Sequence, residues 1–84
     1  MAVYVDDMKA KYGRMIMCHM MADTLEELHE MADKIGIKRK WFQNHKKYPH
    51  YDISKAKRKL AVEFGSKEMS ARDLVKMMRE KGLK

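Results

Sequence analysis

The fold is decided by one stretch of the sequence, Arg14-Met15-Ile16-Met17-Cys18-His19-Met20-Met21. Successive side chains of a β-strand point to opposite faces of the sheet, and from Met15 onward both alternating sets are apolar apart from His19. A strand that is apolar on both sides is typical of the centre of a sheet that is covered on both faces. Residues 14–21 are therefore predicted to form the central strand.

Three segments further along the chain have the apolar spacing of helices. Each begins at a serine or threonine that can cap the first turn, and each is followed by a glycine that can end the last turn. The caps are Thr24, Ser54 and Ser70, and the glycines are Gly36, Gly65 and Gly82. The sequence therefore predicts helices near residues 23–35, 54–64 and 70–81.

The remaining segments are short. Residues 2–6 are rich in strand formers, residues 50–53 have an extended pattern, and residues 37–43 are predicted to form a further strand. Residues 66–69 are expected to be a short strand or a turn, and residues 7–13 a loop. The predicted class is α/β, a small mixed sheet of three to four strands packed with three helices.

Composition narrows the class of protein further. The chain has 84 residues, enough for one core, so we expect a single domain over residues 1–84, and a domain this small often gains stability from a homodimer contact. Cys18 is the only cysteine, which excludes an internal disulfide and fits a reducing compartment. The N-terminal residues lack the pattern of a signal peptide, and the apolar stretch 15–22 is too short to span a bilayer. We therefore expect a cytoplasmic protein with no membrane partner.

The formal net charge is +7, and the excess is local. Residues 37–59 contain nine Lys or Arg and a single acid, Asp52, for a net charge of +8, whereas the rest of the chain carries −1. A concentrated positive field attracts phosphates, although a solvated surface without a partner has the same composition. We expect eight residues here to contact phosphate or nucleic acid: Lys38, Arg39, Lys40, Trp41, Lys55, Lys57, Arg58 and Lys59.

Two features of this basic region favour an anionic ligand. Residues 40–52 interleave four aromatic side chains with lysines and histidines, a pattern suited to stacking on bases and neutralising phosphates. The alternative is that these aromatic side chains fill the core. Residues 54–60 place four cations in the first turns of a predicted helix, against the preference of the helix dipole, and an external anion would explain that placement.

A ligand pocket is predicted around two histidines. His19 lies near the carboxyl end of the predicted central strand, where open α/β sheets bind their ligands. His50 and Asp52 lie two residues apart in an extended stretch and so point to the same side. With Arg14 and Tyr51 they are the predicted ligand-binding residues, and the alternative is a structural network. A metal site is conceivable from five residues: Asp6, His19, His45, His50 and Asp52. No metal and no cofactor are expected, however, because the spacings match no established zinc pattern and one cysteine excludes a thiolate cluster.

Five runs of the sequence form a recognisable set: residues 1–8, 13–20, 22–29, 31–36 and 50–53. Together they resemble a small family of phages, prophages and some actinobacteria that is catalogued as domain of unknown function 4031. The His50-Tyr51-Asp52 run is the most distinctive part. The resemblance implies a phage or prophage origin and supplies no activity. It also implies that seven residues belong to one shared feature, either a site or a structural network: Asp6, Arg14, His19, Asp23, His50, Tyr51 and Asp52.

Three classes of function are open at this point. The leading hypothesis is a small non-enzymatic module that binds a phosphate-bearing ligand, nucleic acid or a nucleotide-type small molecule. If the origin is a phage, the protein would act in the host cytoplasm, for example by blocking a defence enzyme. The second class is a metal-dependent or histidine-based phosphoesterase or nuclease-like enzyme that uses His19, His50 and Asp52. The third is a protein–protein inhibitor or adaptor with a surface rich in the ten methionines.

Overall fold

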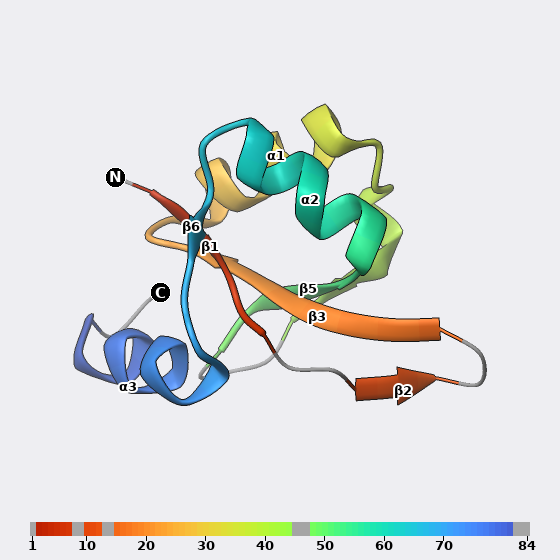
Figure 1. The fold of residues 1–84 in the computed structure, drawn as a ribbon. Coiled ribbons are helices and arrows are strands. Elements are labelled where there is room, and N and C mark those ends of the chain that lie inside the picture. The colour runs from red at the N-terminus through yellow and green to blue at the C-terminus, as the bar shows by residue number, and fades with distance from the viewer. Residues whose placement is uncertain (1, 8–9, 13–14, 45–47, 82–84) are drawn as a thin grey trace.

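The computed structural model describes residues 2–7, 10–12, 15–44 and 48–81. Its elements are three α-helices that follow groups of one to three strands along the chain (Figure 1). They are β1 (Val3–Val5), β2 (Ala10–Tyr12), β3 (Met15–Ala22), α1 (Leu25–Ile35), a 3-10 turn (Arg39–Trp41), β4 (Phe42–Gln43), β5 (His50–Ser54), α2 (Lys55–Glu63), β6 (Lys67–Glu68) and α3 (Ala71–Lys81).

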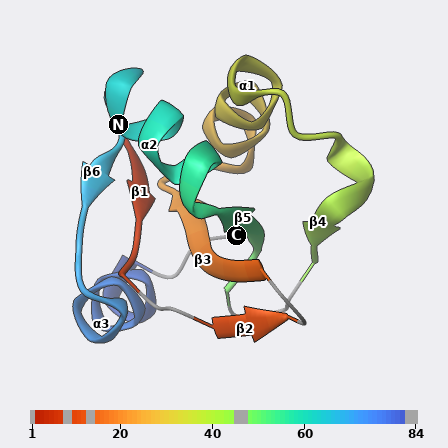
Figure 2. The ribbon, with the colours of Figure 1, turned by 45° about the vertical axis from the view of Figure 1, so that its right-hand side comes forward.

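The strand β3 lies at the centre of a six-stranded sheet of order β4-β5-β3-β1-β6, with β2 paired to β3 outside this path. The β1–β6 pair is parallel and the other pairs are antiparallel, so the sheet is mixed. Figure 2 shows β4 and β6 at the two edges. The predicted α/β class and the central strand are confirmed, and the sheet has more strands than the three to four expected.

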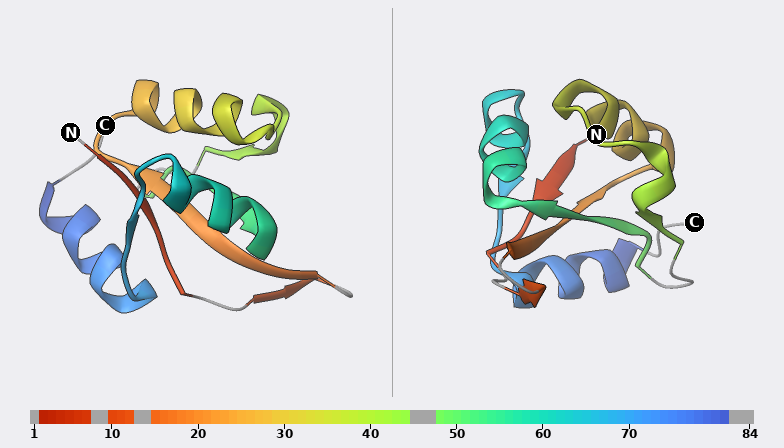
Figure 3. Two further views of the ribbon diagram at one scale, coloured as in Figure 1. Left: turned by 45° about the horizontal axis from the view of Figure 1, so that its top comes forward. Right: turned by 90° about the vertical axis from the view of Figure 1, so that its right-hand side faces the viewer.

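Helices cover both faces of this sheet, with α1 and α2 on one side and α3 on the other (Figure 3). Alternate residues of β3 therefore serve two cores, which explains why the strand is apolar on both sides. The core under α1 and α2 includes Val5, Met20, Leu28, Tyr51, Ile53 and Ala61. The core under α3 includes Tyr4, Met21, Leu74 and Met78.

The three helices begin at the caps that the sequence predicts. The hydroxyl of Thr24 accepts the backbone N–H of Glu27 at 3.2 Å and donates to its carboxylate at 2.9 Å. The hydroxyls of Ser54 and Ser70 likewise accept a backbone N–H three residues further on. The helix α1 ends at Gly36, which has a left-handed φ of 80° that favours glycine. Within the described ranges, no helix is long and apolar enough to cross a membrane.

One strand prediction and one loop prediction differ from the structure. Residues 37–43 are not a continuous strand, because residues 39–41 form the 3-10 turn and only Phe42 and Gln43 pair with β5. The cations at 38–40 are exposed and offer no alternating apolar side to bury. Residues 7–13 contain β2 rather than only a loop, since β2 pairs with the first part of β3 and satisfies its backbone groups there.

Candidate functional site

The pairing of β3 with β5 places His19 directly opposite Asp52. His50 lies two residues before Asp52 on β5, so its side chain leaves the same face of the sheet. The neighbouring residues Cys18 and Tyr51 belong to the core under α1 and α2. The structure therefore brings the two histidines and the carboxylate together on the opposite face, the one that α3 partly covers.

The two imidazole rings and the carboxylate form a compact cluster. The rings of His19 and His50 meet edge to face with centroids 5.0 Å apart. One oxygen, Oδ1 of Asp52, lies 3.6 Å from Nε2 of His19 and 3.4 Å from Nε2 of His50. All three side chains are partly buried. We call His19, His50 and Asp52 the HHD cluster.

The Nδ1 atoms of His19 and His50, the ring nitrogens that do not face Asp52, each lie within hydrogen-bond distance of an oxygen. Nδ1 of His19 lies 2.8 Å from the carboxylate of Asp6, which is only 2% exposed. Nδ1 of His50 lies 2.7 Å from the backbone carbonyl of Tyr48. A carbonyl or carboxylate oxygen can only accept a hydrogen bond, so the Nδ1 atom of each histidine carries the proton and donates. The hydrogen bond with Asp6 raises the pKa of His19, against the opposing effect of burial.

Tyr51 is not part of this cluster, and its prediction as a pocket residue alongside the two histidines is wrong. It lies between His50 and Asp52 on an extended strand, so its side chain points to the other face. There it is fully buried, and its hydroxyl lies 2.7 Å from Nδ1 of His29 on α1. Burial raises the pKa of Tyr51. Arg14 lies outside the described residues.

A basic cavity of about 670 Å³ opens beside the HHD cluster. β4 pairs only with His50 and Tyr51, so it leaves the edge of β5 uncovered beyond them. The cavity lies at this edge, and Asp52 is the only acid among the described residues that line it. The side chains that give the cavity its character are Lys38, Lys40, Trp41, Gln43, Asp52 and Lys57. We refer to it as the basic cavity.

The aromatic wall of the basic cavity is Trp41. It is 58% exposed although tryptophan is usually buried. Nζ of Lys40 lies 5.3 Å from the centroid of its ring, a cation–π distance. An exposed indole beside cations offers a flat surface on which a planar ring can stack.

Three of the predicted phosphate contacts, Arg39, Lys57 and Arg58, form hydrogen bonds or ion pairs within the protein. Lys57 donates to the carbonyl of Ile35 at 2.8 Å, at the negative end of the α1 dipole. Arg39 forms an exposed ion pair of 2.9 Å with Asp33. For Lys57, the contact explains why a cation occupies the start of α2 without any external anion.

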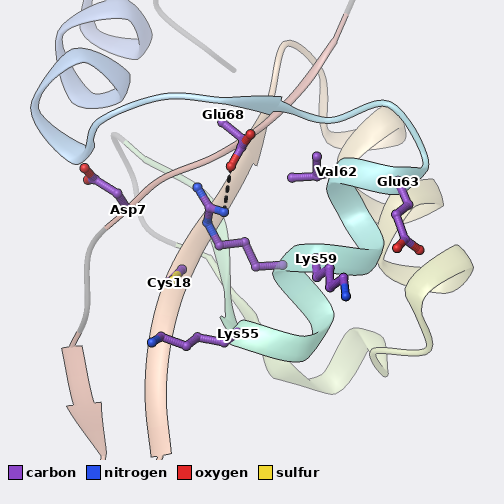
Figure 4. A pocket seen from close by; sticks show the side chains of 8 residues that line it. Asp7, Cys18, Lys55, Lys59, Val62, Glu63 and Glu68 are labelled. Atoms are coloured by element: carbon purple, nitrogen blue, oxygen red, sulfur yellow. Dashed lines mark hydrogen bonds and ion pairs between the residues drawn. The ribbon is translucent and has the colours of Figure 1, made fainter.

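Arg58 is held most firmly among the cations of α2. Its Nε donates to the carbonyl of Asp6 at 2.7 Å, and its Nη1 pairs with Glu68 at 2.9 Å. Lys55 and Lys59 are exposed, and they line a second hollow between α2 and the sheet together with Cys18 (Figure 4). The dipole argument for an external anion therefore applies to these two lysines and not to all four cations.

The family resemblance groups Asp6 with His19, but neither Asp6 nor the carbonyl of Tyr48 was among the predicted pocket residues. Val5 pairs with Met20, and the next step of the same register brings Asp6 alongside His19. That register joins residues 13 positions apart and is not visible in local spacing. The available signal was an acid placed directly after a short apolar strand, where sheets often carry polar functional groups.

Comparison with known proteins identifies the family. The model of the family described as Protein of unknown function (DUF4031) matches residues 3–81. The chain belongs to this family. Neither a search of curated proteins nor a search of solved structures found a match.

Proposed function

We propose that the protein binds a phosphate-bearing ligand, a nucleotide unit either free or within a nucleic acid strand, in the basic cavity. The observation that carries the proposal is the exposed ring of Trp41 beside Lys38 and Lys40. A base can stack on the indole while the ammonium groups neutralise a phosphate. The cavity volume falls within the range of small-molecule sites.

The local charge supports the same ligand. The net charge of residues 37–59 is +8, and this region supplies most of the residues that line the cavity. Of the lysines that line it, Lys57 donates to the carbonyl of Ile35, so the exposed Lys38 and Lys40 are the cations offered to a phosphate. A host-directed role, as the resemblance to phage proteins suggests, would act through this ligand.

Tryptophan fluorescence tests the proposal directly, because Trp41 is the only tryptophan. Titration with a nucleoside triphosphate or a short single-stranded oligonucleotide at low salt should quench the emission. The effect should weaken steeply with added salt, since phosphate contacts release counterions. No change in emission with either probe at low salt would refute stacking on Trp41.

Paired charge variants locate the ligand. Lys38→Gln with Lys40→Gln should weaken binding about tenfold, which corresponds to about 1.4 kcal/mol. The matched control is Lys55→Gln with Lys59→Gln, which removes the same charge from the second hollow. The control should weaken binding less. An equal loss in both would mean that general attraction, and not the basic cavity, holds the ligand.

A second candidate function is supported by the HHD cluster, whose carboxylate also lines the basic cavity. A phosphoesterase or nuclease-like activity would use that cluster against a phosphate held by the lysines. Turnover of nucleotides or oligonucleotides in the presence of divalent metal, lost in Asp52→Ala, is its test. If the protein binds these substrates but turns over none of them with any divalent metal tested, the result favours the non-enzymatic binding module.

A further inference from the structure

We propose that the HHD cluster is a binding site for one divalent transition metal ion of the zinc class. The donor atoms of His19, His50 and Asp52 all lie within 4.8 Å of one another. Zinc binds imidazole nitrogen and carboxylate oxygen at about 2.0 to 2.2 Å, so neighbouring donors of a tetrahedral site lie about 3.4 Å apart. The two nitrogen–oxygen distances in the cluster are 3.4 and 3.6 Å.

These distances fit a shared metal better than direct hydrogen bonds. A nitrogen–oxygen hydrogen bond is usually about 2.7 to 3.2 Å long, and shorter when charged. The contacts of both histidines on their other side, to Asp6 and to the Tyr48 carbonyl, have such lengths at 2.8 and 2.7 Å. The distances from the two Nε2 atoms to Oδ1 of Asp52 are thus those of neighbouring ligands of one metal ion rather than those of hydrogen bonds.

The protonation of the rings also suits a metal. Because each Nδ1 donates to an oxygen behind it, a neutral ring carries its lone pair on Nε2, which faces Asp52. Histidines that bind metals usually donate their other N–H to a carboxylate or a backbone carbonyl in this way. Asp6 and Tyr48 are positioning residues, since they orient the rings without reaching the proposed ion.

The donor set selects the class of metal. Two imidazoles and one carboxylate suit zinc, iron(II), cobalt(II) or nickel(II), whereas magnesium and calcium prefer oxygen ligands alone. The thiol of Cys18 lies on the other face of the sheet and does not contribute. Three protein ligands leave a coordination position open, which is typical of sites that bind or activate a small ligand. The metal site stands on its own geometry and does not depend on the proposed nucleotide ligand.

The first test is calorimetric titration of chelator-treated full-length protein with zinc chloride. We expect one ion per chain, and no heat of binding with magnesium chloride. His19→Ala, His50→Ala and Asp52→Ala should each abolish this binding, and Asp6→Asn should weaken it about 10- to 100-fold. The matched control is His29→Gln, which removes a histidine on the other face and should retain the wild-type affinity.

A second measurement on the wild-type protein keeps the proposal testable if a variant fails to fold. Nitrogen NMR of the histidine rings should show large shifts of Nε2 in His19 and His50 on addition of zinc, and none in His29. Binding of zinc that leaves His19 and His50 unshifted would overturn the proposal. So would the absence of zinc binding to the wild-type protein, or an affinity unchanged in His19→Ala.

Discussion

Asp6 holds His19 at two points: one oxygen of its carboxylate accepts the backbone N–H of His19 at 2.7 Å, and the other lies 2.8 Å from its ring Nδ1. The two residues lie 13 positions apart in the chain, and the pairing of β1 with β3 brings them together. The orientation of the ring, and the nitrogen that faces Asp52, therefore depend on a carboxylate buried at the end of β1.

Asp6→Asn is expected to reverse the tautomer of His19. An amide has only one acceptor oxygen, and if it keeps the backbone bond, its NH2 group faces Nδ1 and needs an acceptor there. The proton would then move to Nε2. The buried network would be weaker, with a loss of about 1 to 3 kcal/mol in the free energy of unfolding. Nitrogen NMR of the ring and urea denaturation measure the two effects, and an unchanged tautomer would contradict the role given to Asp6.

Tyr51→Phe should destabilise the fold without affecting either candidate site. The change removes the hydroxyl that lies 2.7 Å from His29 in the core under α1. A lost buried hydrogen bond lowers the free energy of unfolding by about 1 to 2 kcal/mol. Zinc affinity and nucleotide affinity, measured in the same preparation, should equal those of the wild type. A loss of either affinity with unchanged stability would place Tyr51 back in the site.

The position of Tyr51 is an example of what local sequence patterns can predict. Alternation along residues 50–52 predicts that His50 and Asp52 share a face, and the same rule puts Tyr51 on the other one. Caps such as Thr24 and the two apolar faces of β3 are local signals, so they were predictable. The pairing of β2 with β3 and the 3-10 turn are local structures that the apolar pattern does not indicate. The contact of Asp6 with His19 depends instead on a register between residues 13 positions apart, which is set by tertiary packing.

The thiol of Cys18 should react slowly at neutral pH. Burial raises its pKa, and the charge of Asp6 raises it further, while Arg58 and Lys55 act in the opposite direction. A raised pKa means less of the reactive thiolate at any given pH below it. A thiol reagent should therefore modify the folded protein far more slowly than the same protein in denaturant. Equal rates in the two conditions would mean that the second hollow gives open access to the sulfur.

A comparison of variants at Lys57 and Lys59 distinguishes a cation that forms a contact within the fold from an exposed cation on the same helix. Lys57 lies in the first turn of α2, where the helix dipole disfavours positive charge, so removing its charge should slightly relieve that repulsion, whereas Lys59 lies at the middle of the helix. Lys57 also donates to the Ile35 carbonyl at the end of α1, next to Gly36, and this contact links the two helices that cover one face of the sheet. Lys57→Met should therefore lower the free energy of unfolding by about 1 kcal/mol and the melting temperature by about 5 °C.

Lys59→Met removes the same charge from an exposed position and should change the stability by less than about 0.5 kcal/mol in either direction. Thermal melts of the two variants in one buffer make the comparison. If both variants lose the same stability, the contact with Ile35 contributes nothing measurable. Lys57 would then return to the group of cations whose placement only an external anion explains. If only Lys57→Met is destabilised, the charge of Lys57 has a partner within the fold, and the proposed ligand of the basic cavity is expected to depend on Lys38 and Lys40 instead.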